Sequence, residues 1–288
     1  GLRPSPGRVT RGTSNNLYAP LSVQGPMARN VPDVALFLDS MAGFCPRDPL
    51  TFDAPAQSFS EAVAARRLPR RVAWSADFGG VAPMDSETRE ICAKAAQSFK
   101  ELGATVEEAT PDVGQIADAF MVLRAQSYVV DRELQIAQYP DKFKQDIIWN
   151  TKLGLEATPS RIGWAERERA AFYRRVAAFF ETYDLLITPG ASTPAFDVTR
   201  RMPEKIDGKV VEHYLGGSLI TAIPTLMGVP SLAVPCGFDQ YGRPVGLQII
   251  PPPRGEGALL AAGAAFEELT GLDKQVPIDP RSGKVPPA

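Results

Sequence analysis

The clearest pattern of apolar and polar positions lies toward the C-terminal end of the chain. Residues 221–227 predict a short helix, provided that Pro224 lies in its first turn, where a missing N–H is tolerated. Residues 231–234 and 245–250 are apolar runs too short for helices and bounded by Pro and Gly, which is typical of buried strands. The segment 239–244 between them carries the Asp, Gly and Pro of a chain reversal. The pattern therefore predicts a β-hairpin inside a covered sheet.

Strand and helix patterns alternate through the rest of the chain. Strands are predicted at residues 72–77, 105–108 and 184–189, and helices at 34–41, 86–102, 113–138, 143–153, 159–183 and 256–269. Residues 48–71 lack a clear period and are expected to form a surface connection with one helical turn near 60–66. A strand, a helix and a strand in succession favour a crossover between parallel strands. We therefore expect an α/β fold, with a mixed β-sheet core covered by helices on both faces. The Pro-rich tail after Gly271 is expected to lie extended on the surface.

Residue spacing also predicts which side chains are buried and which turns need glycine. On the helix predicted at 113–138, the positions expected on one buried face are Ile116, Phe120, Leu123, Ser127, Val130 and Leu134. Gly237 and Gly242 lie in reversals where a positive φ is expected.

Composition excludes several functional classes. Hydrophobic residues make up 44% of the 288 residues, which is enough for a substantial core. A net charge of −2 with interspersed acids and bases offers no footprint for nucleic acid or an anionic membrane, and no apolar run approaches a membrane span. Cys45, Cys92 and Cys236 include no C-x-x-C pair, so neither a disulfide framework nor a zinc site is expected. A reducing, cytoplasmic setting fits best, and no metal or organic cofactor is indicated.

The residues alone complete no common catalytic motif. The single histidine, His213, follows Glu212 in a polar connector and is expected to be a surface residue rather than a triad base. No Ser lies in a G-x-S-x-G turn, no Ser is followed three residues later by Lys, and no Gly-rich phosphate loop is present. Cys236 follows a buried strand without a basic neighbour, so it is expected to be a packing residue.

Four segments together resemble one known family. Residues 228–250 read GVPSLAVPCGFDQYGRPVGLQII and precede an apolar helix that carries AAFEEL. This order resembles the C-terminal signature of the amidase signature family, hydrolases that use a Ser-Ser-Lys triad. Residues 1–9, GLRPSPGRV, are similar to the family's GLKPTxGRV segment. Residues 21–33 resemble SLDxxGPMARTVxD, and residues 180–196 resemble FExYDLLLTPxxxxPAF.

The resemblance implies a division of the catalytic domain. In the family, a Gly/Ser-rich stretch with the catalytic Lys, the bridging Ser and the nucleophilic Ser precedes the GLKPTxGRV segment, and this chain contains none of that stretch. Residues 1–288 are therefore expected to be the C-terminal part of a single amidase signature domain, with no catalytic residue in this chain. The implied reaction is hydrolysis of the C–N bond of a small-molecule carboxamide through a serine acyl-enzyme. The implied partner is an N-terminal segment or chain of the same enzyme, and the oligomeric state stays open, with a homodimer among the options.

By the same resemblance, this chain supplies walls of the substrate pocket. Ile220 and Thr221 match positions that line the acyl side of the cleft in related amidases, with Tyr214 near the entrance. Trp149 and Asn150 resemble a Trp-Asn pair of one amidase subgroup and are expected to reach the cleft from their helix. Core packing is the alternative for Ile220 and Trp149.

The sequence is also compatible with two other functions. The first is the A subunit of a glutamine-dependent amidotransferase, which shares the signature but delivers ammonia to its partner. The second is a non-catalytic scaffold or binding chain, which the missing triad makes a serious option. A synthetase-like partner or a tRNA requirement distinguishes the first. Mass analysis of the native protein distinguishes the second, because an accompanying N-terminal polypeptide supports the enzyme and a lone chain supports the scaffold.

Overall fold

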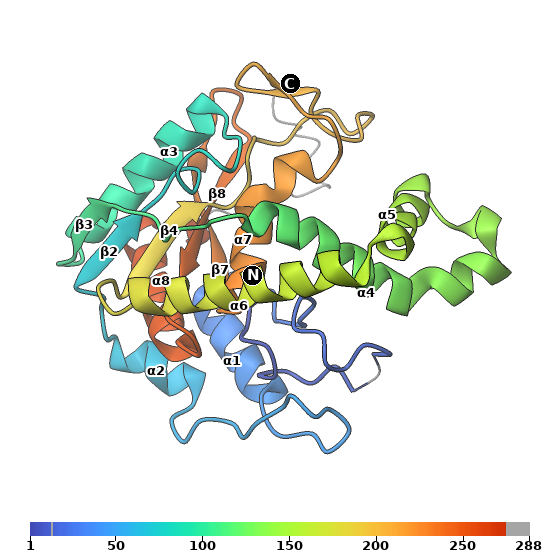
Figure 1. The fold of residues 1–288 in the computed structure, drawn as a ribbon. Helices are drawn as coiled ribbons and strands as arrows, with labels where there is room; N and C mark the ends of the chain where they lie inside the picture. Colours follow the sequence, from blue (N-terminus) through green and yellow to red (C-terminus); the bar gives the residue numbers. More distant parts are fainter. Residues whose placement is uncertain (13, 275–288) are drawn as a thin grey trace, which may run out of the picture.

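Strands from distant parts of the chain form one sheet in the computed structural model, which describes residues 1–12 and 14–274 (Figure 1). Within these residues the strand order is β1-β7-β8-β4-β2-β3. The strands are β1 (Leu2–Arg3), β2 (Arg71–Trp74), β3 (Thr105–Glu108), β4 (Leu185–Pro189), β7 (Ser231–Phe238) and β8 (Pro244–Ile250), and a separate small hairpin consists of β5 (Lys205–Ile206) and β6 (Lys209–Val210). From position 275 on, the tail predicted to lie extended falls outside the described residues.

The sheet is mixed, as predicted. β2 pairs in parallel with β3 and with β4, whereas β8 runs antiparallel to β4 and β7, and β1 runs antiparallel to β7. The predicted hairpin is formed by β7 and β8, which pair from Leu232 opposite Ile249 to Phe238 opposite Pro244. β7 extends beyond its predicted end through a bulge near Pro235, which re-aims the strand toward the reversal.

Helices cover both faces of the sheet. They are α1 (Val31–Met41), α2 (Phe59–Ala65), α3 (Ser86–Gln97), α4 (Ile116–Gln138), α5 (Gln145–Glu156), α6 (Pro159–Phe179), α7 (Leu219–Met227) and α8 (Glu256–Thr270), with 3-10 turns at Ser98–Lys100, Pro140–Lys142, Gly216–Ser218 and Leu272–Lys274. On one face, α1, α2, α3 and α8 pack around Val72 and Ile187. On the other face, α4, α6 and α7 pack around Ala73 and Leu186. Successive strand residues therefore enter opposite apolar clusters, and the predicted α/β architecture is confirmed.

The helices of the described part of the chain do not meet the requirements of a membrane span. None of those within residues 1–12 and 14–274 is both long enough and apolar enough to cross a bilayer.

Pro224 lies in the interior of α7 rather than in its first turn, which corrects the sequence expectation. Its ring removes the N–H that would bond the carbonyl of Ile220, one turn earlier. Gln248 of β8 supplies a replacement donor, because its Nε2 lies 3.4 Å from the Ile220 carbonyl oxygen and 3.0 Å from Thr188 Oγ1. The proline is tolerated in mid-helix because a buried side chain of the sheet satisfies the freed carbonyl.

The second half of α4 is less buried than its spacing predicts. Ile116, Phe120 and Leu123 are buried, as expected, but Val130 and Leu134 are 55% and 82% exposed. Figure 1 shows the reason: α4 continues past the edge of the sheet, where α5 is the helix beside it. The buried-face prediction therefore holds only for the turns of α4 that lie over the sheet.

Gly237→Ala and Gly242→Ala are each expected to lower the free energy of unfolding by about 1 kcal/mol or more. Gly242 has a left-handed φ of 75°, as predicted. Gly237, at φ 159°, is close to extended, so its need for glycine has a different cause: an added Cβ lies 2.9 Å from Cγ2 of Ile91. Urea denaturation of both variants measures the loss. Wild-type midpoints for both variants are incompatible with this account of the hairpin.

Candidate functional site

The exposed side of α7 forms one wall of the candidate site. Thr221 is exposed, and its hydroxyl donates to the carbonyl of Ser218 at 2.9 Å. Thr225, one turn later, is half-buried and donates to the carbonyl of Thr221 at 3.0 Å. Ile220 points into the apolar cluster under α7 and is 0% exposed, so its side chain serves core packing. Thr221 is thus the residue of this predicted pair that is free to contact a ligand.

Asn150 and Tyr214, predicted as site residues, meet at Arg124 of α4. Arg124 Nη1 donates to Asn150 Oδ1 at 3.0 Å, and Nη2 donates to the Tyr214 hydroxyl at 2.9 Å. Nη2 also donates to the Tyr128 hydroxyl at 2.9 Å, and the guanidinium lies 4.4 Å from the centre of that ring. Asn150 Nδ2 donates to the Tyr214 hydroxyl at 2.7 Å and to the Asp146 carbonyl at 2.6 Å. We call Arg124, Tyr128, Asn150 and Tyr214 the Arg124 cluster.

Trp149 packs beside the Arg124 cluster. Its ring lies edge-on to Tyr214, with the ring centres 6.3 Å apart, and 5.8 Å from the ring of His213. Trp149 is half-buried against the apolar cluster of α4, α6 and α7. His213, predicted to be a surface residue, is also half-buried, and its Nδ1 makes no hydrogen bond with any described residue. These contacts pack Trp149 against Tyr214 and so restrict the position of the Tyr214 ring.

Arg124 is a site residue that the sequence patterns did not single out. Its neighbours Leu123 and Ala125 are both buried, and it lies in a largely apolar part of the predicted helix. A charged side chain at such a position is costly unless polar groups surround it. The presence of one arginine among buried helix positions was therefore the available signal.

Arg124 and Tyr128 line a hollow of about 410 Å³ between α4, α5 and α7, which we call the Arg124 hollow. Its other lining residues are Leu21, Ser22, Phe120, Ser127, Asp131, Arg132, Ile147 and Thr225. Its volume lies within the range of small-molecule sites, roughly 300–1,000 Å³.

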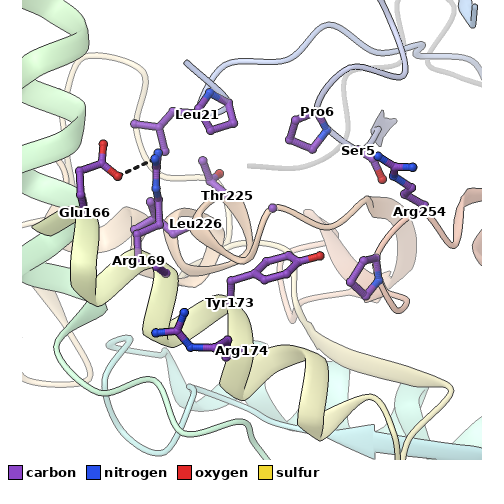
Figure 2. Close-up of a pocket in the computed structure, with 14 residues that line it drawn as sticks. Ser5, Pro6, Leu21, Glu166, Arg169, Tyr173, Arg174, Thr225, Leu226 and Arg254 are labelled. Carbon is purple, nitrogen blue, oxygen red and sulfur yellow. Dashed lines mark ion pairs between the residues drawn. The ribbon is translucent and has the colours of Figure 1, made fainter. Parts of the chain in front are cut away.

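A second hollow, of about 470 Å³, lies between α6, α7 and the N-terminal segment (Figure 2). Its lining residues are Ser5, Pro6, Pro20, Leu21, Glu166, Arg169, Ala170, Tyr173, Arg174, Thr225, Leu226, Gly228, Pro253 and Arg254. Figure 2 shows Arg169, Tyr173 and Arg174 on α6, with Ser5 and Arg254 across the hollow. Because Leu21 and Thr225 line both hollows, the two adjoin along α7.

Cys92 and Cys236 are adjacent in space although far apart in sequence. Their Sγ atoms lie 3.8 Å apart, and both are free thiols. The hydrogen bond with Cys236 and burial raise the pKa of the Cys92 thiol, so Cys92 is protonated at neutral pH and is a poor nucleophile. Cys236 Sγ lies 3.4 Å from the Val245 carbonyl inside the hairpin, a position that agrees with a packing role. Across the described residues, His, Cys, Asp and Glu side chains do not gather in threes as metal ligands.

Comparison with known proteins assigns the chain to a family. The family model described as Amidase matches residues 1–260. An acylamidase of Rhodococcus erythropolis is 29% identical over 285 residues, which cover 97% of this chain and 59% of the relative. The glutamyl-tRNA(Gln) amidotransferase A subunit of Moorella thermoacetica is 31% identical, with 96% of this chain and 60% of the relative covered. The chain thus spans about three fifths of the length of these curated relatives.

The solved structures agree with this assignment. A bacterial aryl acylamidase described as one of the amidase signature enzymes superposes with a TM-score of 0.82 at 25% identity, covering 95% of this chain and 59% of that one. The match includes the mixed sheet and the helices on both of its faces. With the family model covering most of the sequence, the chain belongs to the amidase signature family.

Proposed function

We propose that the chain is part of an amidase-type hydrolase that cleaves the C–N bond of a linear carboxamide through a serine acyl-enzyme. Residues 1–288 form the C-terminal part of a single amidase signature domain and supply core and pocket walls. The catalytic Lys, bridging Ser and nucleophilic Ser belong to an N-terminal segment or chain of the same enzyme. The observation that carries the proposal is the family match over residues 1–260. The free thiols of Cys45, Cys92 and Cys236 favour a reducing, cytoplasmic setting.

Uncovered surface supports the need for an N-terminal segment. On β7, Ala233 and Pro235 are exposed, although the strand lies inside the sheet. Large exposed apolar side chains in the N-terminal part of the chain are Tyr18, Met27, Leu36, Phe37 and Phe44. Exposed apolar groups gathered in one part of a chain are the kind of surface that further polypeptide covers.

The pocket wall is assigned to the exposed side of α7 and to the Arg124 cluster. We assign Thr221, Tyr214, Trp149 and Asn150 as substrate-contacting or substrate-positioning residues. Tyr214 and Asn150 bind the Arg124 side chain, and Trp149 packs against Tyr214. Ile220 is assigned to the core because it has no exposed surface. Hydrolysis of an amide also needs oxyanion donors, which we place on the N-terminal segment together with the triad.

The amidotransferase A subunit is the second candidate, because a protein of that name is 31% identical to this chain. Such a protein would require a partner to use the ammonia that it releases. Free amide hydrolysis without any partner favours the amidase, whereas activity that appears only with tRNA and a synthetase-like partner favours the amidotransferase.

The test is to express the chain with and without an upstream segment that carries the Lys, the bridging Ser and the nucleophilic Ser. We expect the chain alone to be poorly soluble or partly folded and inactive on a chromogenic anilide. Together with the segment it should melt cooperatively and hydrolyse the anilide, because the two pieces share one core. Thermal melting and anilide turnover are the measurements.

The control is the same segment with its nucleophilic Ser replaced by Ala, which should restore the cooperative transition without the activity. Anilide hydrolysis by the chain alone would show that the catalytic residues do not belong to a separate N-terminal segment, and it would require a nucleophile within residues 1–288. A chain that melts cooperatively by itself and stays inactive with the segment supports the scaffold alternative.

A further inference from the structure

The Arg124 guanidinium is held entirely by neutral groups. Its hydrogen-bond acceptors are the Asn150 amide oxygen and the hydroxyls of Tyr128 and Tyr214. Among the described residues, no carboxylate lies within ion-pair distance of it, whereas the buried or half-buried Arg8 and Arg175 are paired with glutamates. A half-buried positive charge without a counter-charge is a favourable site for an anion.

The hydrogen-bond geometry leaves unused donors around this charge. The Tyr214 oxygen accepts from both Arg124 and Asn150, so its two lone pairs are engaged and its own proton can only be donated outward. The Asp146 carbonyl accepts from Asn150 Nδ2, which fixes the orientation of that amide. Arg124 uses three of the five N–H groups of an arginine in this network. Each tyrosine hydroxyl and Arg124 therefore still have a proton to donate.

Two members of the cluster face an open space of suitable size. Arg124 and Tyr128 line the Arg124 hollow, whose volume is about 410 Å³. Its charged lining residues are Arg124, Arg132 and Asp131, so the charge of the wall is positive by one unit, counting two arginines against one aspartate. Its apolar wall, formed by Phe120, Ile147 and Leu21, suits the methylene part of a small ligand.

We propose that the Arg124 hollow binds a carboxylate carried by the substrate, so that the preferred substrates are amides with a carboxylate on a short acyl chain. The guanidinium supplies the charge and its unused N–H groups on Nε and Nη1, and the Tyr128 hydroxyl adds a further hydrogen bond. Tyr214 and Asn150 act as positioning residues that hold the guanidinium in one orientation. This inference rests on the proposed amidase function and specifies its substrate class.

The test compares two anilides in the enzyme assembled with its N-terminal segment. Succinyl 4-nitroanilide carries the carboxylate, and butyryl 4-nitroanilide has an acyl chain of the same carbon number without it. We expect kcat/KM for the succinyl compound to be higher by about tenfold or more, chiefly through a lower KM. In Arg124→Gln this preference should fall by about tenfold or more, and Arg124→Lys should recover part of it by keeping the charge.

Matched variants separate this role from a structural one. Arg167→Gln on α6, at an exposed position away from both hollows, should keep the preference for the succinyl compound. Tyr128→Phe removes one donor and keeps the ring, and it should reduce the preference without lowering the melting temperature as a cavity would. If Arg124→Gln does not fold, Tyr128→Phe decides the question. Equal turnover of the two anilides by the wild type, or a preference unchanged in the folded variants, overturns the carboxylate site.

Failure of the amidase function itself gives a different result. If neither anilide is hydrolysed, the proposed function is wrong, and calorimetric titration of the same assembled protein with succinate and with butyramide then tests the site. Succinate binding that Arg124→Gln abolishes, with no binding of butyramide, supports the carboxylate site independently of catalysis. Absence of succinate binding to the wild type overturns it.

Discussion

Glu256→Ala is expected to lower the free energy of unfolding by about 3–5 kcal/mol, more than the other substitutions proposed for this chain. Glu256, in the first turn of α8, is 0% exposed, and its Oε2 lies 3.3 Å from Nη2 of Arg8, whose side chain is 7% exposed. Its Oε1 accepts the backbone N–H of Ser5 at 2.9 Å. Removing the carboxylate leaves a buried guanidinium without a counter-charge, because Arg8 is otherwise enclosed by the rings of Phe52 and Phe59.

A matched control lies on the same helix. Glu268 of α8 pairs with Arg66, but both side chains are more than half exposed, so Glu268→Ala should change stability by only about 0–1 kcal/mol. Urea denaturation of the assembled enzyme measures both variants. The double variant Arg8→Met, Glu256→Leu should recover much of the loss, since no buried charge is then left unpaired. Equal losses for Glu256→Ala and Glu268→Ala would contradict the assignment of Glu256 to a buried ion pair.

This ion pair also explains how the N-terminal segment is fixed. Residues 1–9 were recognised from the sequence by their resemblance to a family segment, without any prediction of their contacts. In the structure, the backbone of Ser5 and the side chain of Arg8 both bind one carboxylate from the other end of the chain. A sequence pattern does not reveal such a contact, because the partners are 251 and 248 positions apart.

The sheet was predictable because its central strands are short, apolar and largely buried. The run 184–189 and the hairpin at 231–250 are apolar and bounded by Pro and Gly, so the apolar spacing and the flanking turn residues predict the same strands. The position of Pro224 was not predictable in the same way. Its tolerance in mid-helix depends on Gln248, a residue of another element, and a local pattern carries no information about that donor.

The candidate site likewise contains residues that were predictable from the sequence and one that was not. Asn150 and Tyr214 were identified by family resemblance, and the structure joins them through one hydroxyl group. Arg124 belongs to no family motif quoted from the sequence, and its role depends on neutral partners supplied by α5 and by the connector before α7. Sites assembled from several elements are therefore only partly visible in a sequence, even where each element is predicted correctly.

Gly154→Ala is expected to lower the free energy of unfolding by about 1–3 kcal/mol and to weaken the preference for carboxylate-bearing amides. Gly154 of α5 is buried against α4, and an added Cβ lies 2.4 Å from the Ala125 carbonyl oxygen and 2.5 Å from Cγ2 of Val129. Alanine has the higher helix propensity by about 1 kcal/mol, so only a steric conflict with the backbone of α4 gives a net loss. That conflict moves α5, and with it Asn150, away from Arg124.

The matched control for Gly154→Ala is Gly163→Ala in the interior of α6. There an added Cβ lies 3.3 Å from a guanidinium nitrogen of Arg167, the end of a flexible side chain, so alanine should stabilise the helix by about 0.5–1 kcal/mol. Melting curves and the succinyl-to-butyryl ratio of kcat/KM are measured for both variants in the assembled enzyme. Gly154→Ala should reduce both quantities, whereas Gly163→Ala should leave the ratio unchanged. The contrary result is a Gly154→Ala variant that is as stable as Gly163→Ala and keeps the wild-type ratio of kcat/KM. The added methyl group would then have been accommodated without moving either helix, and the α4–α5 contact would not set the position of Asn150.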